Sequence, residues 1–281
     1  MAITNFIPTV WSETLLRALD RKYVGVAHCN REFEGEIKEK GNSVKICGIY
    51  PISVANYTKN NNMSNPQVLT DICRELKIDQ AKYFNFQIDD IDLAQASPRL
   101  MNTAMKSAAD SLANAADRYV FSLYDEAGTT ITKNLPTAED VLDVFLQTRT
   151  QLLKNGVADA SDIVYEITPE VSELLFRANI QLASDNGELL KQGYIGKLLG
   201  SEIFVTNNVN VEINASGSYH HCIARSKRAI AFAEQLSEMD AYRPELRFAD
   251  AMKGLHLYGA KTVFPEEMVH MNFVFEGVPE D

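Results

Sequence analysis

The chain has 281 residues, 46% of them apolar, so it can bury a substantial core as one large domain or two smaller ones. Its 38 acidic and 27 basic side chains give a formal charge of −11, which disfavours general affinity for nucleic acid. No run of eighteen apolar residues occurs, and residues 1–14 lack a basic stretch followed by an apolar one, so the sequence predicts neither a membrane span nor a signal peptide.

The first 34 residues are rich in apolar side chains and include the single tryptophan. Phe6, Ile7 and Trp11 precede a short helix-like run over residues 15–19. A segment this apolar must be covered, either by the rest of its own chain or by a partner subunit. The sequence leaves both possibilities open.

Residues 35–88 have the pattern of extended strands. Residues 43–49 alternate apolar and polar side chains, and residues 69–78 resemble a returning strand. Residues 59–66, between them, are polar and have the composition of an exposed loop. We therefore predict a protruding hairpin, which needs a neighbour to lie on because two strands alone bury too little surface.

The longest regular segment is a predicted helix over residues 97–126. Ser97 suits the N-cap and Pro98 the first helical position, and the interior contains no glycine or proline. Apolar positions recur at steps of three and four residues: Leu100, Ala104, Ala108, Leu112, Ala115, Tyr119 and Leu123. At about 1.5 Å per residue this helix would be on the order of 45 Å long. It suits the spine of an extended molecule, with a core helix of a two-layer domain as the alternative.

The remaining residues alternate between strand and helix patterns, as in a mixed sheet with helices packed on it. Residues 131–136 are interpreted as a linker, and Thr137 with Asp140 resembles the capping box of a helix that ends at residues 155–156. A second helix is predicted to begin at Thr168 and Pro169. Strands are predicted at residues 163–167, 202–206, 221–224, 255–263 and 269–275, and a strand or short helix at 229–233.

Candidate chemical motifs are weak. Residues 193–197 contain two glycines and a lysine, but the spacing does not fit a phosphate loop, so we interpret them as a tight turn between strands. His220 and Cys222 could share a metal, but no second ligand pair supports them, and a hydrogen-bonded histidine with a buried thiol is the simpler interpretation. The basic run 225–228 is interpreted as a solvated face.

The four cysteines are widely spaced and form no CxxC pair, which indicates reduced thiols rather than a disulfide framework. A nucleophile pair made from Cys73 or Cys222 and a distant histidine stays open, because such partners meet only in space. A cytosolic α/β enzyme with such a Cys/His site is therefore one alternative function.

Seven short segments, taken in order, resemble one known family. They are NFIPTVW at 5–11, GNSVKI at 41–46, YFNFQIDD at 83–90, ITPE at 167–170, GYIGKLLG at 193–200, IFVTNN at 203–208 and LYGAK at 257–261. Their order is similar to that in the major capsid proteins of tailed bacteriophages, which have the Hong Kong-type phage capsid fold also seen in encapsulin shells. The chain looks most like the branch that uses a separate scaffolding protein.

The resemblance implies an α+β fold and a wedge-shaped subunit. The implied parts are an N-terminal arm (1–34), an extended hairpin (35–88), a peripheral domain with the spine helix (89–136), an axial domain (137–250) and returning strands of the peripheral domain (251–281). Fewer than a hundred residues precede the spine, so we expect no fused scaffolding segment.

The resemblance also implies a structural role without catalytic residues, cofactor or metal. The chain would form hexamers and pentamers of an icosahedral shell around double-stranded DNA, without sequence-specific DNA binding or membrane contact. Expected partners are a scaffolding protein, a portal and a decoration protein, and the expected location is the virion, assembled in the host bacterial cytoplasm. The candidate assembly contacts are Phe6, Ile7, Trp11, Tyr57, Lys59, Asn60 and Met63. An encapsulin-like compartment shell is the alternative of the same kind.

Overall fold

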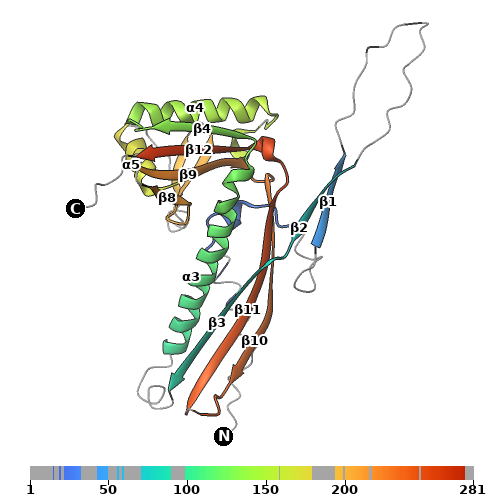
Figure 1. Ribbon diagram of the computed structural model, residues 1–281, viewed down its shortest axis with the longest axis vertical. Helices are drawn as coiled ribbons and strands as arrows, with labels where there is room; N and C mark the ends of the chain where they lie inside the picture. The colour runs from blue at the N-terminus through green and yellow to red at the C-terminus, as the bar shows by residue number, and fades with distance from the viewer. Residues whose placement is uncertain are drawn as a thin grey trace.

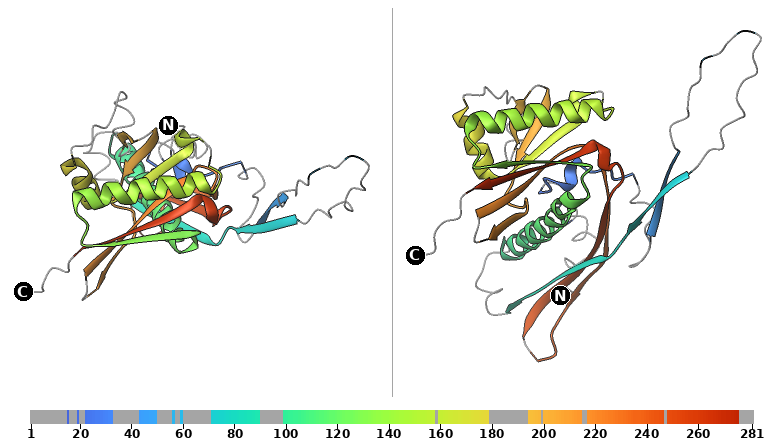
Figure 2. Two further views of the ribbon diagram at one scale, coloured as in Figure 1. Left: turned by 90° about the horizontal axis from the view of Figure 1, so that it is seen from above. Right: turned by 45° about the horizontal axis from the view of Figure 1, so that its top comes forward.

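The computed structural model describes residues 15, 19, 22–32, 43–49, 56, 59, 71–89, 99–157, 159–178, 194–198, 200–214, 217–246 and 248–275. These residues form three parts, which we call the head, the stem and the ribbon (Figure 1). The head lies at one end of the long stem. The ribbon leaves the side of the stem near the head and extends away from both, as the two views of Figure 2 also show. The described part of the chain is therefore elongated.

The head is a sheet with two helices. Its elements are β4 (Thr129–Asn134), α4 (Ala138–Lys154), β5 (Ile163–Ile167), α5 (Pro169–Arg177), β6 (Tyr194–Leu198), β7 (Ser201–Val205), β8 (Val211–Asn214), β9 (Gly217–Ser226) and β12 (Met268–Phe275), with 3-10 turns at Ala160–Asp162 and Pro265–Glu267. The strand order is β4-β12-β9-β5-β7-β6, and β8 also pairs with β9. The β4–β12 and β5–β7 pairs are parallel and the others are antiparallel.

Helix α4 begins and ends as its sequence predicts. The Thr137 hydroxyl accepts a hydrogen bond from the backbone N–H of Asp140, and the Asp140 carboxylate accepts one from the backbone N–H of Thr137. Gly156, with φ of 96°, follows the C-cap residue Asn155. The buried face of the helix consists of Val141, Val144, Phe145, Thr148 and Leu152. Local pattern alone therefore fixes this helix, including its buried face.

The stem packs one long helix on a three-stranded antiparallel sheet. It holds β3 (Gln80–Asp89), α3 (Arg99–Phe121), a 3-10 turn at Ser122–Glu126, β10 (Ile230–Tyr242) and β11 (Ala249–Thr262), with strand order β10-β11-β3. The predicted spine helix is confirmed, although its regular α-helical part ends at Phe121. Its fully buried stripe differs from the predicted one by about one position and contains Met105, Ala109, Leu112, Ala113, Ala116, Val120 and Phe121. The predicted positions Ala104, Ala108 and Ala115 are half-buried beside β3.

The ribbon consists of β1 (Ser43–Ile49) and β2 (Asp71–Lys77), which pair antiparallel as predicted. The apolar face of its base, with Val44, Ile46, Leu76 and Ile78, packs on Ala231, Ala233 and Leu257 of the stem sheet. Gly259 of β11 makes this contact possible, because a Cβ there would lie 2.0 Å from the carbonyl oxygen of Lys77. The base of the hairpin is thus held by its own chain.

The segment before the ribbon packs inward. Leu15, Leu19, Tyr23 and Val26 are buried in the main core against α3 and the sheets, and Asn30 bridges to Ala231 of β10. Of the two possibilities that the sequence left open, these four apolar residues thus take their cover from their own chain. The apolar residues before Leu15 lie outside the described residues.

Two sequence interpretations are corrected. The predicted linker at 131–136 is largely strand β4, whose β-branched residues pair with β12. Within the predicted turn at 193–197, residues 194–197 belong to strand β6, and the turn into β7 contains Gly200 with φ of 90°. Strand pairing also crosses the predicted domain boundaries, because β10 joins β11 and β3 in the stem whereas β12 joins the head sheet. The division into domains remains a prediction.

Candidate assembly surfaces

Most of the predicted assembly contacts lie outside the described residues. Phe6, Ile7, Trp11, Tyr57, Asn60 and Met63 belong to this group. Lys59 is described, and it lies exposed in a turn. Its exposure agrees with a loop at the end of the hairpin, and its role in assembly remains a prediction.

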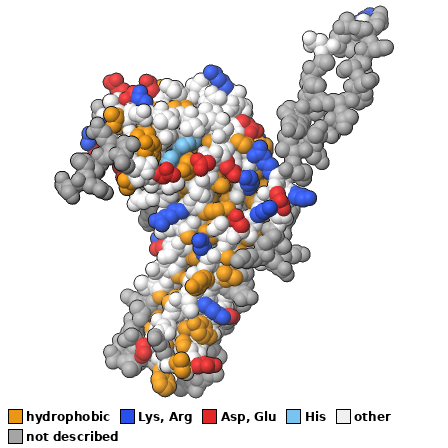
Figure 3. All heavy atoms as spheres, viewed as in Figure 1, with side chains coloured by type: hydrophobic (Ala, Val, Ile, Leu, Met, Phe, Trp, Pro, Cys, Tyr) orange, Lys and Arg blue, Asp and Glu red, His pale blue; other side chains and the backbone are white. Residues whose placement is uncertain are grey.

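The far end of the stem carries apolar side chains that the chain itself leaves uncovered. In the turn between β10 and β11, Leu246 is 96% exposed and Phe248 is 85% exposed. Farther along the stem, Tyr83 of β3 is 78% exposed and lines a hollow of about 220 Å³ whose other lining residues are Asn85, Asp240, Lys253, Gly254 and Leu255. Figure 3 shows hydrophobic side chains gathered at this end of the stem. The far end of the stem therefore carries an exposed apolar projection, Leu246 with Phe248.

A second apolar surface follows the stem itself. A groove of about 470 Å³ lies between α3 and β3. Phe84 and Phe86 line one wall, and small side chains of α3, among them Ala104, Ala108 and Ala115, line the other. These helix positions belong to the stripe that the sequence predicted as buried. The groove explains why they are apolar without being part of the core.

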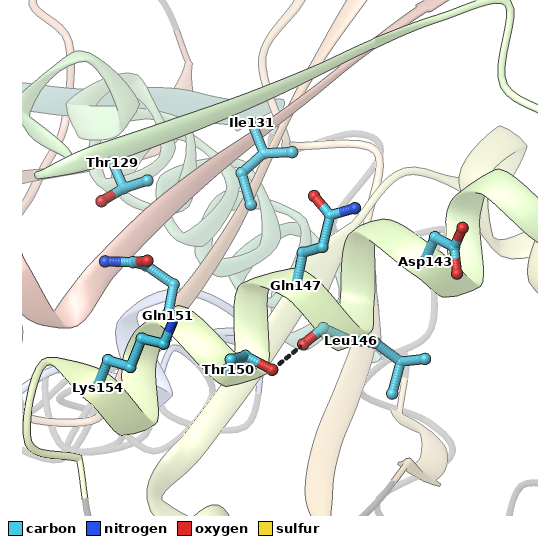
Figure 4. Close-up of a pocket in the computed structure, with 8 residues that line it drawn as sticks. All are labelled: Thr129, Ile131, Asp143, Leu146, Gln147, Thr150, Gln151 and Lys154. Atoms are coloured by element: carbon cyan, nitrogen blue, oxygen red, sulfur yellow. Dashed lines mark hydrogen bonds between the residues drawn. The ribbon is translucent and has the colours of Figure 1, made fainter.

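The head has a broader and more polar groove between α4 and β4 (Figure 4), with a volume of about 530 Å³. Its lining residues are Thr129, Ile131, Asp143, Leu146, Gln147, Thr150, Gln151 and Lys154. The sticks of Gln147 and Gln151 point toward β4, and the Thr150 hydroxyl donates to the carbonyl oxygen of Leu146. The lining is mostly polar and includes one acidic and one basic side chain, Asp143 and Lys154.

A buried charge cluster connects the inward-packed segment to the head and the stem. Arg225 of β9 is fully buried, and its Nε and Nη2 donate to both carboxylate oxygens of Glu166 at 3.0 and 2.8 Å. The guanidinium also donates to the carbonyl oxygens of Gly25 and His28, each at 2.8 Å. Burial opposes ionisation, but the charge and the hydrogen bonds of Arg225 hold the pKa of Glu166 below its usual value. The interpretation of residue 225 as part of a solvated face is thus wrong.

The spine helix contributes a second buried acid to this junction. Each carboxylate oxygen of Asp117 accepts one backbone N–H, from Val24 and Val26, at 3.0 Å. Burial raises the pKa of Asp117 to about 6, although these hydrogen bonds act in the opposite direction. Asp117 thus accepts hydrogen bonds from the N–H groups of the backbone turn at residues 24–28, and Arg225 donates hydrogen bonds to the carbonyl oxygens of the same turn. No local sequence pattern signals this role, since both residues depend on partners about ninety or more positions away.

A third cluster joins the histidines of β9 and β12. His221 Nδ1 lies 3.0 Å from His270 Nε2, and the Tyr124 ring stacks on His221 with centroids 4.1 Å apart. Burial, and then the neighbouring His221, lower the pKa of His270 to about 4, so both rings are neutral at neutral pH. Glu212 lies 3.9 Å from His221 Nε2. Among the described residues, no group of three or more acidic, histidine or cysteine side chains could hold a metal ion.

The described cysteines are poor nucleophiles. Burial raises the pKa of the Cys222 thiol to about 12 and that of Cys29 to about 11. His220, two residues before Cys222, instead contacts the Thr168 hydroxyl at 2.9 Å. This agrees with a hydrogen-bonded histidine and a buried thiol. The side chain of Cys73 lies outside the description.

No family model and no curated protein matches this chain. Solved structures do match. A chain of Mycobacterium phage Che8 is 28% identical with a TM-score of 0.69, covering 89% of this chain and 90% of that one. A chain from the capsid of cyanophage P-SCSP1u is 14% identical with a TM-score of 0.66, covering 89% and 87%. A chain of a virus-like particle from Pyrococcus furiosus is 13% identical with a TM-score of 0.57, covering 92% and 96%.

These likenesses extend over nearly the full length of both chains in each pair. They confirm the predicted fold class, an α+β chain with the fold of the tailed-phage major capsid proteins. None of the helices in the described ranges has the length and apolar character that crossing a bilayer requires.

Proposed function

We propose that this chain is the major capsid protein of a tailed bacteriophage and assembles into an icosahedral shell around double-stranded DNA. The observation that supports it most strongly is the match to the Che8 phage chain, at 28% identity over about nine tenths of both chains. The match to the cyanophage capsid chain supports the same class. The likeness is to shell-building proteins, and it favours a structural role over an enzymatic one.

The surfaces of the described residues suit such a role. A shell subunit needs several shallow contacts, each of which can be weak because closed symmetry repeats it many times. The stem end with Leu246 and Phe248, the groove between α3 and β3, and the groove beside α4 are three such surfaces. Burial of apolar area there contributes about 25 cal/mol per Å² before ordering costs. The acidic net charge of −11 agrees with a shell that encloses DNA without gripping it.

The finer parts of the proposal rest on the sequence resemblance. We expect hexamers and pentamers, a separate scaffolding protein, a portal and a decoration protein, with assembly in the host bacterial cytoplasm and a final location in the virion. The segments with Phe6, Ile7 and Trp11, and with Tyr57, Lys59, Asn60 and Met63, are proposed to contact neighbouring copies. The predicted peripheral and axial domains are also part of the proposal.

Expression of the full chain tests the proposal directly. Negative-stain electron microscopy and velocity sedimentation should show closed shells or free hexamers and pentamers, either from the chain alone or with the scaffolding protein of the same genome. Discrete monomers or dimers under both conditions would contradict it.

An encapsulin-like compartment is the second candidate, because the Pyrococcus furiosus virus-like particle has the same fold. It is less well supported, since its identity and TM-score are lower than those of the Che8 and P-SCSP1u chains. The contents of natural particles separate the two candidates. A genome and a portal vertex support the phage capsid, whereas an enzyme cargo without a genome supports the compartment.

A further inference from the structure

The ribbon brings two of the four cysteines opposite each other. The register of β1 and β2 pairs Cys47 with Cys73, next to the pairs Ile46 with Arg74 and Lys45 with Glu75. We propose that Cys47 and Cys73 form an intrachain disulfide when the protein meets a disulfide oxidant such as oxidised glutathione. The sequence alone did not suggest this, because 25 residues separate the two cysteines and neither belongs to a CxxC motif.

The backbone geometry at this pair fits a disulfide. Directly opposed residues in antiparallel strands have Cα atoms about 4.5 or 5.5 Å apart, depending on their hydrogen bonding. A disulfide accepts Cα separations of about 4.4–6.8 Å. Both kinds of opposed pair therefore lie within the range, so the thiols can be joined without a change of register.

The register also places positions 47 and 73 on the ribbon face opposite to the one that packs on the stem. Val44, Ile46 and Leu76 are buried against the stem, whereas Lys45 and Glu75 are exposed. Because strand residues alternate between faces, positions 47 and 73 share the face of Lys45 and Glu75. An oxidant in solution can approach this face.

The other two cysteines lack these features. Cys222 is fully buried in the head sheet, and the Cys29 thiol donates to the carbonyl oxygen of Gly25 at 3.4 Å. Their raised pKa values keep both thiols protonated at neutral pH. Oxidation should therefore be selective for one pair.

The chemistry balances as two exchange steps. The thiolate of one cysteine attacks a sulfur of oxidised glutathione, which forms a mixed disulfide and releases one glutathione thiol. The second cysteine then attacks the protein sulfur of the mixed disulfide and releases the second glutathione. Two protein thiols lose two hydrogens in total, and one molecule of oxidised glutathione is reduced to two thiols.

The role that we infer for this disulfide in the particle rests on the proposed function, whereas the chemistry of its formation does not. Reduced cytosol would leave the ribbon unlinked during assembly. After release of the particle into an oxidising medium, the bond would close residues 47–73 into a covalent loop at the base of the hairpin. Such a closed loop has fewer unfolded conformations, which would help to keep an extended hairpin in place.

The test uses the full unassembled chain, with and without oxidised glutathione at about pH 8, followed by denaturation and alkylation. Mass spectrometry should find four alkylated cysteines in the reduced chain and two in the oxidised one. Peptide mapping should recover a reductant-sensitive peptide that joins Cys47 to Cys73. The single variants Cys47→Ser and Cys73→Ser should each lose this peptide.

Four alkylated cysteines after oxidation would overturn the proposal. So would cross-linking between chains, seen as a dimer on a non-reducing gel, or glutathione left on both cysteines. These outcomes are independent of shell formation. A chain that forms the disulfide but never assembles would contradict the proposed function alone, and an assembling chain without the bond would contradict only this inference.

Discussion

Replacement of Arg225 by methionine should greatly destabilise the folded subunit. The methionine fills much of the same space but removes the charge that pairs with Glu166, which is itself fully buried. It also removes the donors for the carbonyl oxygens of Gly25 and His28. The residue thus connects three parts of the structure, namely the head sheet and two positions of the inward-packed segment.

The magnitude follows from these contacts. Loss of one partner of a buried ion pair costs about 3–5 kcal/mol, and each buried carbonyl left without a donor adds about 1–3 kcal/mol. Proton uptake by Glu166 limits the sum, so we expect a net loss of about 4 kcal/mol at pH 8. Domains have total stabilities of about 5–15 kcal/mol, and the melting temperature should fall on the order of 10 °C.

The pH dependence gives the loss a second signature. In the native protein the lowered pKa of Glu166 gives stability that is present above the pKa of the unfolded chain and is lost as pH falls. In the Arg225→Met variant, burial without a partner raises that pKa, so acid favours the folded form. The difference in free energy of unfolding between the variant and the native protein should therefore shrink as the pH falls from 8 to 5.

Urea unfolding of the unassembled chain, followed by circular dichroism, measures both effects. The double variant Arg225→Met/Glu166→Met removes the unpaired charge and should recover at least half of the loss. Lys22→Met is the control, because it breaks an exposed pair with Asp110 and should cost about 1 kcal/mol or less. A single variant as stable as this control, or a double variant no better than the single one, would refute the reasoning.

Four further predictions concern the core, the histidine cluster, the stem end and the hairpin. Leu19→Ala should cost about 2–5 kcal/mol in the unassembled chain, measured by urea unfolding, because Leu19 is fully buried; a loss below about 1 kcal/mol would contradict inward packing. The pKa of His270 is about 4, below the usual 6.5, so between these pH values the unfolded chain binds more protons than the folded chain. The free energy of unfolding should therefore decrease by up to about 3 kcal/mol as the pH falls from 6.5 to 4. The variant His270→Gln should show a smaller decrease of unfolding free energy over this pH range. The same decrease as in the native protein would show that another group causes the acid sensitivity. The pair Leu246→Ser/Phe248→Ser should change unfolding by about 0.5 kcal/mol or less but reduce shell yield in sedimentation, and an unchanged yield would exclude the stem end as a contact. Deletion of residues 59–66 should leave a folded subunit that assembles poorly. An undiminished shell yield in the same sedimentation assay would contradict this prediction.

The predictability of each element follows the range of the interactions that form it. Helix α4 was predicted with its cap and its end, because both depend on residues within a few positions. Strand β4 was read as a linker, since its extended form depends on pairing with β12, more than a hundred positions later. The exposed Leu246 and Phe248 were also missed, although two apolar residues in a turn with proline and charged residues are a usable signal.

The sequence by itself determined the long spine helix, the hairpin and the capsid resemblance, because periodicity, turn residues and motif order are local or sequential properties. Only the tertiary structure decided that Arg225 is buried, that Leu15, Leu19, Tyr23 and Val26 pack inward, and that positions 47 and 73 are paired in the ribbon. The physical reason is that burial, ion pairing and strand register are relations between distant parts of a chain. A linear pattern states which residues can take part in them, and folding selects the partners.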